Sequence, residues 1–251
     1  YPVDATQALA RRARELGVDI RLSTTVKRIK TKADKVTGVE TDAGEFESEM
    51  VVLAAGAWSG ALAQTAGLRL ELMPKRVMAA NSSRAGGLGR YPVIIDRATG
   101  LYTRNDRNER NLFGLEPTLP LSNADDPSAF EVIPGALEAG LQRLAHRLPP
   151  LARSTDAVGW AAPDGYSDDG HAILGHAPGV EGLYLAMAGG GTNFKTAPAI
   201  GEALTELIVH GQTRYVDLIP FRATRFAEGQ PLVGAHEYSQ RMVGEEERSI
   251  E

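Results

Sequence analysis

Three consecutive glycines, Gly189 to Gly191, separate an apolar segment from a segment whose apolar residues have helical spacing. Glycines let a ligand approach the backbone, and the start of a helix offers unpaired N–H groups with a partial positive charge. Lys195 adds a full positive charge near the first turn of the expected helix. This pattern is typical of an anion-binding turn, although a tight strand-to-helix connection without a ligand would have the same spacing.

A second pattern of small residues follows the longest apolar run, Met50 to Ala57. Within it, Ala55 and Gly56 leave room for something to pack closely before a helical pattern begins at Trp58. That partner could be a ligand or the following helix on a sheet. The residues alone favour the helix.

Carboxylates and imidazoles gather between Asp164 and His176. Such groups can ligate a metal ion or act as general acid and base. However, His171 and His176 are five positions apart, which is not the spacing of a helical zinc motif. A surface turn rich in Asp and Gly is the favoured interpretation.

The chain lacks the residues that several other kinds of catalytic or binding site require. The chain has 0 cysteines, which excludes disulfides, thiolate catalysis and cysteine zinc sites within it. It also lacks the G-x-S-x-G nucleophile turn and the G-x-G-x-x-G dinucleotide fingerprint.

The elements that must position these residues form an α/β pattern, interrupted by an α+β region. Apolar spacing predicts helices over 4–16, 58–66, 127–148 (with a break at Pro134-Gly135) and 197–210. It predicts strands over 18–22, 24–31, 35–41, 45–49, 50–54, 70–72, 93–95, 111–115 and 182–188. The turn Ala33-Asp34 indicates a hairpin, and the strand 50–54 is expected to be buried on both faces.

Composition bounds the function. The 251 residues include 43% hydrophobic residues, enough for a sizeable core. The net charge of −5 argues against a nucleic-acid binder, and no apolar run approaches the roughly 18 residues of a membrane span. A chain without cysteine fits a reducing compartment, so a cytoplasmic location is expected.

Several segments together resemble the FAD-dependent amine and amino-acid oxidoreductases of the D-amino-acid oxidase superfamily, with the sarcosine- and glycine-oxidase branches nearest. Residues 51–59 are similar to the family's VVxAAGAWS segment, and 169–175 to its PDGxPIIG segment. The other similar segments, in the family's order, are 9–18, 25–26, 179–184 and 189–201.

The resemblance implies a FAD-binding α/β domain with an inserted antiparallel-sheet substrate domain. Residues 1–69 and 156–215 would belong to the first and 70–155 to the second, with 216–251 as a C-terminal tail. Val26 would contact the adenine side of FAD. The other implied FAD contacts are Ala55, Gly56, Gly189, Gly190, Gly191, Thr192, Asn193, Phe194, Lys195 and Thr196.

The departures from the family pattern also have consequences. The family's first βαβ unit, with its G-x-G-x-x-G, is missing, so we expect a fragment of the full enzyme that holds FAD weakly or not at all. The missing portion could be supplied as a separate chain. Without cysteine, any bound FAD is non-covalent.

For the substrate, the resemblance implies that Lys195 binds a carboxylate and that Tyr102 and Tyr166 line the pocket; these three are the expected catalytic residues. Asp164 stands where glycine-oxidase-like members place an arginine, so an amine whose cation suits Asp164 is the alternative. The lysine that sarcosine oxidases use for the reaction with oxygen is replaced at Leu112 or Asn111. Whether the enzyme is an oxidase or a dehydrogenase is therefore left open.

The expected function is therefore the oxidation of a C–N bond in a small amine or amino acid, by hydride transfer to the flavin and hydrolysis of the imine. The expected partner is this small substrate, with no nucleic acid and no membrane. The alternative is a non-catalytic binding or interaction domain. A less favoured alternative is a metal hydrolase that would use Asp164, Asp168, Asp169, His171 and His176.

Overall fold

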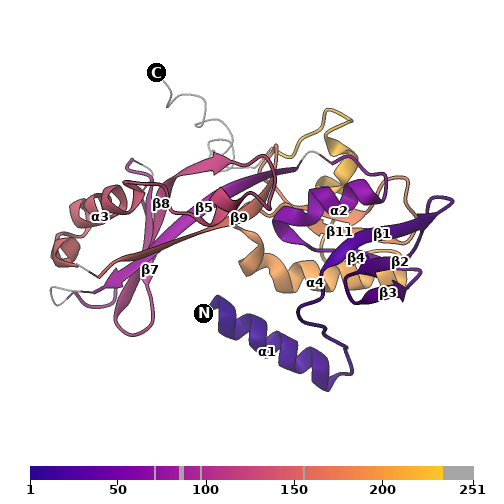
Figure 1. Ribbon diagram of the computed structural model, residues 1–251, viewed down its shortest axis with the longest axis horizontal. Coiled ribbons are helices and arrows are strands. Elements are labelled where there is room, and N and C mark those ends of the chain that lie inside the picture. The colour runs from indigo at the N-terminus through magenta and orange to yellow at the C-terminus, as the bar shows by residue number, and fades with distance from the viewer. Residues whose placement is uncertain (71, 85–87, 97, 155, 234–251) are drawn as a thin grey trace. The chain divides into compact units, whose positions relative to one another are not determined.

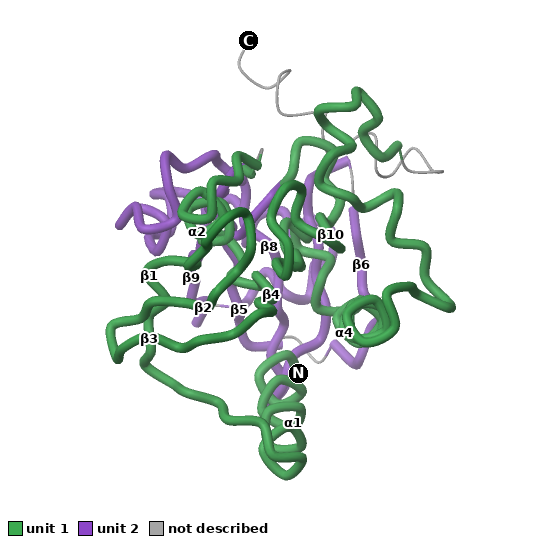
Figure 2. Tube along the Cα trace, turned by 90° about the vertical axis from the view of Figure 1, so that its right-hand side faces the viewer, with its two compact units in different colours: residues 1–72, 167–251 green, residues 73–166 purple. Residues whose placement is uncertain are grey.

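The chain forms two compact units in the computed structural model, which describes residues 1–70, 72–84, 88–96, 98–154 and 156–233. Unit 1 contains residues 1–72 and 167–251, and unit 2 contains residues 73–166 (Figures 1 and 2). The domain boundaries expected from the sequence stay predictions. The helices and strands that position the predicted site residues are described below, one unit at a time.

Unit 1 begins with the helix α1 (Pro2–Glu15), none of whose described residues is buried. The strand predicted over 18–22 is wrong, because this segment has no strand partner among the described residues. Val18 and Leu22 are 53% and 75% exposed. The alternation of apolar and polar residues that suggested a strand therefore has no sheet on which to pack.

A three-stranded antiparallel sheet follows, in the order β1-β2-β3. Its strands are β1 (Val26–Lys32), β2 (Lys35–Thr41) and β3 (Gly44–Glu47). The predicted hairpin is confirmed, with Ala33 and Asp34 at φ 49° and 61°. Two successive residues with positive φ are the geometry of a tight turn whose twist matches the flanking strands.

The second sheet of unit 1 has the order β10-β11-β4. Its strands are β4 (Val51–Leu53), β10 (Ile173–His176) and β11 (Leu183–Met187), and β11 is parallel to β4. The prediction that 50–54 is buried on both faces is wrong: Leu53 is buried, but Val52 is 45% exposed. The helix α4 (Asn193–His210) packs on β10 and β11, in a cluster with Leu174 and Ala186, and Val52 lies outside that cluster.

The remaining helical elements of unit 1 are short. A 3₁₀ turn, η1 (Gly56–Trp58), leads from β4 into the helix α2 (Ser59–Thr65). Two further 3₁₀ turns, η4 (Ile219–Phe221) and η5 (Ala223–Arg225), follow α4. Residues 234–251, the end of the predicted tail, lie outside the described residues.

Unit 2 contains a five-stranded sheet in the order β6-β7-β8-β5-β9, and the pairs β6–β7, β7–β8 and β8–β5 are antiparallel. The strands are β5 (Leu72–Ser83), β6 (Ile94–Asp96), β7 (Leu101–Asn105), β8 (Arg110–Pro120) and β9 (Val158–Ser167). The helix α3 (Ala136–Arg147) covers one face, where Leu144 packs with Phe113 and Leu115. The 3₁₀ turns η2 (Pro127–Phe130) and η3 (Pro149–Arg153) flank it.

Three of these strands differ from the sequence expectation. Of the strand predicted over 70–72, only Leu72 belongs to a strand, as the first residue of β5; Leu70 is outside it, and residue 71 lies outside the described residues. The strands β7 and β9 were not predicted. Pro163, Asp164 and Gly165 in β9 have low strand propensity, so its state is decided by tertiary packing and not by local preference.

The fold class expected from the sequence is confirmed, because the chain is a mixed α/β protein with antiparallel sheets. None of the helices among the described residues combines the length and the apolar character needed to cross a membrane.

Candidate active site

Parallel pairing brings two of the predicted segments to the same edge of a sheet. Leu185 of β11 pairs with Leu53 of β4, so both strands end on the same side. Ala55 and Gly56 follow β4, and the Gly189–Gly191 turn follows β11. In open α/β sheets, ligands bind at the carboxyl ends of the strands. The predicted small-residue segments therefore share the edge at which a ligand is expected.

The turn after β11 has an unusual backbone. Ala188 has φ 60° although it carries a side chain and is buried, and Gly190 and Gly191 follow at 48° and 76°. A non-glycine residue held in this region costs free energy, and such strain gathers at functional sites. The hydroxyl of Thr192 donates a hydrogen bond to the Gly189 carbonyl at 2.6 Å, which closes the turn.

The helix α4 starts directly after this turn, with Thr192 as its N-cap residue. No side-chain hydrogen bond caps this start within the described part of the chain, and the first turn holds no acidic residue. Instead it holds Lys195, which is exposed and forms no ion pair with any described residue. A cation at the positive end of a helix is unfavourable unless an anion is close. The arrangement therefore suits an anionic ligand.

Two glycines of this edge also leave room for a ligand. Gly56 and Gly191 have φ 55° and 76°, and a Cβ added at either would meet nothing within 4 Å. Val26, the predicted contact on the adenine side, lies in the other sheet of unit 1, where it pairs with Thr41. Three features of the described residues are therefore compatible with bound FAD. They are the glycine turn, the helix start without a side-chain cap, and a lysine without an ion pair.

In unit 2, the two predicted pocket tyrosines lie on strands. Tyr102 belongs to β7, and its neighbours Leu101 and Thr103 are buried on the α3 side. Tyr102 therefore lies on the opposite face and is 41% exposed. Burial raises the pKa of its phenol above the usual 10.0, and the negative charge of Glu116 raises it further, against the effect of Arg104. The phenol is consequently neutral at pH 7 and can donate a hydrogen bond.

Tyr166 shares that face by strand alternation. In β9, Ala161 packs in the core under α3, so Asp164 and Tyr166 alternate onto the other side. The ammonium of Lys75 lies 5.0 Å from the centroid of the Tyr166 ring. The structure thus places Tyr102, Tyr166 and Asp164 on one face of the unit 2 sheet.

The two positions considered for oxygen reactivity lie on opposite faces of β8. Asn111 is fully buried on the α3 side, where its amide oxygen accepts a hydrogen bond from the Tyr91 hydroxyl at 2.9 Å. Leu112 alternates onto the face of Tyr102. Leu112 is therefore the position that shares a face with the predicted pocket residues.

The segment between Asp164 and His176 is not a surface turn throughout. Residues up to Ser167 belong to β9, and Asp169 is buried against Arg225, which is 0% exposed. The guanidinium donates from Nε to Asp169 Oδ2 at 2.7 Å and from Nη2 to Oδ1 at 2.8 Å. Because this carboxylate is already paired, it is not a free metal ligand. The described residues contain no group of three or more potential ligands.

Arg225 is the buried partner of Asp169, and sequence reasoning missed it. It lies 56 positions from Asp169. It follows Pro220-Phe221-Arg222 in a segment that was expected to be a tail. Nothing in the local pattern distinguishes it from Arg214, which is exposed, or Arg222, which is half-buried.

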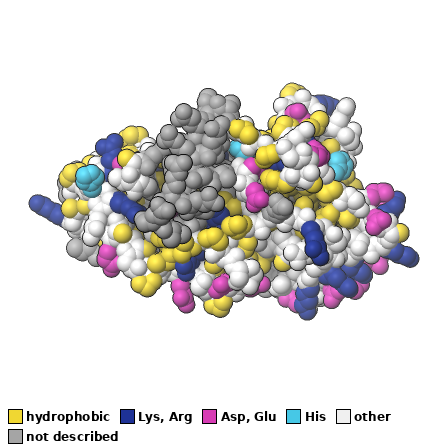
Figure 3. Space-filling view, turned by 90° about the horizontal axis from the view of Figure 1, so that it is seen from above, with side chains coloured by type: hydrophobic (Ala, Val, Ile, Leu, Met, Phe, Trp, Pro, Cys, Tyr) yellow, Lys and Arg dark blue, Asp and Glu magenta, His cyan; other side chains and the backbone are white. Residues whose placement is uncertain are grey.

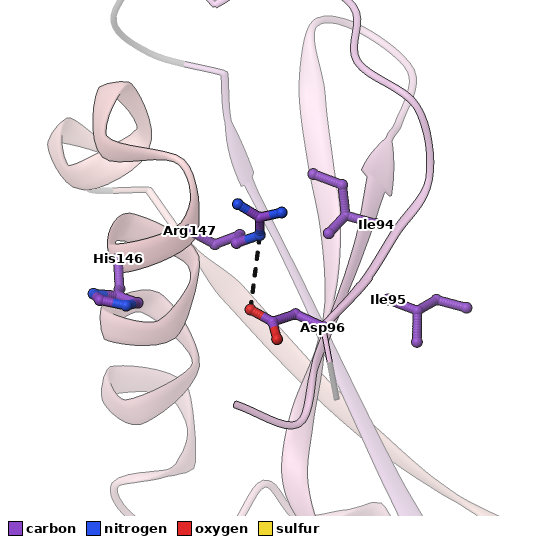
Figure 4. Close-up of a pocket in the computed structure, with 5 residues that line it drawn as sticks. All are labelled: Ile94, Ile95, Asp96, His146 and Arg147. Carbon is purple, nitrogen blue, oxygen red and sulfur yellow. Dashed lines mark ion pairs between the residues drawn. The ribbon is translucent and has the colours of Figure 1, made fainter. Parts of the chain in front are cut away.

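A cavity of about 530 Å³ lies elsewhere in unit 2, between β6 and the end of α3 (Figure 4). Arg147 and Asp96 point toward each other across it and form an ion pair at 3.7 Å, whereas Ile95 points to the other side of its strand. The other lining residues are Ile94 and His146. None of the predicted site residues lines this cavity.

Basic residues near β1 to β3 are balanced by acidic ones. Figure 3 shows Lys and Arg interspersed with Asp and Glu on the face it presents. The described ion pairs here join Arg28 to Glu40, Lys30 to Glu45 and Lys35 to Glu181. They are mostly solvent-exposed and add little stability.

Comparison with known proteins points to one family. Residues 1–207 match the family of FAD dependent oxidoreductases abbreviated DAO. A glycine oxidase from Pseudomonas aeruginosa is 33% identical over 189 residues, which cover 75% of this chain and 49% of that protein. A 4-methylaminobutanoate oxidase (formaldehyde-forming) from Paenarthrobacter nicotinovorans is 27% identical over 231 residues, 84% of this chain and 26% of that one. The chain therefore spans between about a quarter and a half of these relatives.

Solved structures show the same fold. L-proline dehydrogenase from P. horikoshii superposes with a TM-score of 0.84 at 23% identity, covering 92% of this chain and 61% of that one. Glycine oxidase from Geobacillus kaustophilus superposes with a TM-score of 0.75 at 25% identity, covering 91% and 57%. The resemblance noted in the sequence is confirmed, and with a match over residues 1–207 this chain belongs to the DAO family of FAD-dependent oxidoreductases.

Proposed function

We propose that the protein carrying this chain oxidises a C–N bond of a small amine or amino acid, with FAD bound non-covalently. The observation that carries the proposal is the unpaired Lys195 in the first turn of α4, beside the Gly189–Gly191 turn. The family supports the cofactor, because DAO proteins are FAD-dependent. The names of the relatives, among them glycine oxidase and sarcosine dehydrogenase, support a small amine or amino acid.

Bound FAD would supply the redox chemistry, by accepting a hydride from the substrate carbon next to nitrogen, after which the imine hydrolyses. The residues of this chain would bind and orient. The backbone of the Gly189–Gly191 turn and the start of α4 would face the cofactor, from Thr192 through Thr196. Ala55 and Gly56 would pack beneath it, and Val26 would lie on the adenine side.

For the substrate, we propose that Lys195 binds a carboxylate and that Tyr102 and Tyr166 orient the molecule. Lys195 belongs to unit 1 and the tyrosines to unit 2, so each role is tested by its own variant. An amine substrate whose cation pairs with Asp164 is the alternative within the same reaction.

The test is anaerobic reduction of the flavin by candidate substrates. This chain, and any longer gene product that carries it, is mixed with FAD and then with glycine, N-methylglycine, proline or 4-methylaminobutanoate. Loss of the oxidised flavin band and formation of an aldehyde or oxo acid are the expected results. Bound flavin that no amine or amino acid reduces would contradict oxidation and favour the non-catalytic binding alternative.

The glycine turn gives a direct prediction for cofactor binding. A Cβ at Gly189 would collide with the side-chain amide of Asn193, so Gly189→Ala must displace that side chain, which belongs to the first residue of α4. We expect the Kd for FAD to rise by about tenfold or more, the equivalent of ~1.4 kcal/mol. Isothermal titration with FAD measures this.

The matched control is Gly201→Ala on the same helix. Gly201 is exposed within α4, and a Cβ there meets nothing within 4 Å. Alanine should stabilise the helix by about 0.5–1 kcal/mol and leave the Kd for FAD unchanged. Equal Kd values for both variants would remove the Gly189 turn from the cofactor site.

A further inference from the structure

A glycine lies directly opposite Tyr102 in the unit 2 sheet. The pairs Thr103 with Phe113 and Arg104 with Leu112 place Gly114 of β8 across from Tyr102 of β7. On the other side of β8, Gly114 pairs with Ala79 of β5. The row of paired residues across β6, β7, β8 and β5 is therefore Ile95, Tyr102, Gly114 and Ala79, with a glycine directly beside the tyrosine (strands in Figure 1).

The backbone does not require glycine at this position. Gly114 is absent from the described residues with positive φ, so any L-residue could adopt its conformation. Glycine inside a strand also lowers sheet stability, and it often marks a place where another group approaches closely. The reason for Gly114 must therefore be the space that a side chain would fill.

That space is occupied by the ring of Tyr102. A Cβ at Gly114 would lie 2.5 Å from Cδ1 and 2.7 Å from Cζ of Tyr102, and still closer to Cε1. These separations are far inside van der Waals contact, and the opposing atoms belong to a rigid ring. The ring consequently lies against the bare backbone of β8, and even a methyl group would push it away.

We infer that Gly114 is a positioning residue for Tyr102, which fixes the height of the phenol above the face of the sheet opposite α3. The role of that phenol toward the substrate rests on the proposed function. The position of the ring does not, because it follows from the strand register and the missing Cβ alone.

Charged side chains on the same face of the sheet also act on the phenol of Tyr102. Arg104 lies two residues along the same strand and Glu116 two residues beyond Gly114, both on the face of Tyr102 by alternation. Burial raises the pKa of Tyr102, with a further contribution from Glu116. Lifting the ring away from β8 would expose it to water and lower this pKa, which gives a readout that does not depend on activity.

The experiment labels tyrosine with carbon-13 at Cζ and follows its NMR shift against pH, with Tyr102→Phe to assign the signal. In Gly114→Ala we expect the pKa of Tyr102 to fall toward its usual 10.0. If the substrate assay succeeds, KM should rise by about tenfold with a smaller change in kcat, as for a displaced binding group.

A control separates ring displacement from general loss of stability. A Cβ at Gly140 of α3 would press on Leu115 and lie 3.2 Å from Cε2 of Phe113, on the other face of the same sheet. Gly140→Ala should therefore lower the stability and leave the pKa of Tyr102 unchanged. An unchanged pKa in folded Gly114→Ala, or an equal shift in Gly140→Ala, would overturn the inference.

If Gly114→Ala does not fold, a double variant tests whether the clash with the Tyr102 ring is the cause. With the ring removed by Tyr102→Ala, alanine at 114 should be tolerated, so the Tm of Tyr102→Ala/Gly114→Ala should be at least as high as that of Tyr102→Ala. A double variant that remains unfolded while Tyr102→Ala folds would show that Gly114 is required for another reason. Neither result depends on whether the protein oxidises amines.

Discussion

Replacing Asp169 with asparagine is expected to lower the free energy of unfolding by about 3–5 kcal/mol, as for other broken buried ion pairs. The reason is the guanidinium of Arg225, which is 0% exposed and would remain buried without a countercharge. In the native chain it donates to both Asp169 oxygens and to the carbonyls of His171, Phe221 and Arg222. Urea unfolding followed by circular dichroism measures the loss.

Two comparisons test the cause. Glu15→Gln breaks the exposed pair with Arg12, in which both side chains are more than 60% exposed, and should leave the unfolding free energy nearly unchanged. Replacing both partners, as in Asp169→Asn/Arg225→Met, should cost less than Asp169→Asn alone, because no buried charge is left. A single variant as stable as the native chain would contradict the buried-pair account.

The same pair predicts how stability depends on pH. Burial raises the pKa of Asp169, but the hydrogen bonds from Arg225, Leu232 and His171 outweigh it and lower the pKa from 3.8 to about 2. The stabilisation is therefore complete above pH 3.8 and is lost as the pH falls toward 2. Unfolding curves recorded across this range should show a smaller decrease in Asp169→Asn than in the native chain, because Asp156, whose pKa is also lowered to about 2, still contributes in both.

Replacing Lys195 with methionine is expected to raise KM for a carboxylate substrate by about 10- to 100-fold. This corresponds to the roughly 1.5–3 kcal/mol of a hydrogen bond to a charged group. Lys195 is the exposed cation in the first turn of α4, and it forms no ion pair with the described residues. Methionine keeps the length of the side chain and removes the charge, and steady-state kinetics measures the change.

Two further variants test whether the effect of Lys195→Met comes from the loss of a substrate contact. Lys32→Met, which removes an exposed charge at the β1–β2 hairpin, should leave KM unchanged. Asp164→Asn should raise KM only for an amine substrate, because it removes a partner for a cation. If Lys195→Met has no effect and Asp164→Asn raises KM, the protein binds an amine and Lys195 does not contact the substrate.

Local sequence signals were sufficient where one segment determines its own shape. The hairpin at Ala33-Asp34 and the glycine turn before α4 could be predicted, because turn residues and periodicity lie within a few positions of each other. The family could also be recognised, because the spacing of several segments is shared.

Sequence reasoning failed where the state of a segment depends on distant partners. β7 and β9 are strands because β8 and β5 lie beside them, although β9 contains Pro163 and Gly165. Gly114 gives no signal of its role until the strand register places it opposite Tyr102. The roles of the predicted FAD and substrate contacts stay proposals, since only ligand measurements can assign them.

The most direct test of the central claim is a titration of this chain with FAD, followed by absorbance between 300 and 550 nm. The account predicts weak but saturable binding that Gly189→Ala reduces and Gly201→Ala does not. Titrations that never saturate, for this chain and for any longer gene product that carries it, would contradict the proposal that this protein works with FAD.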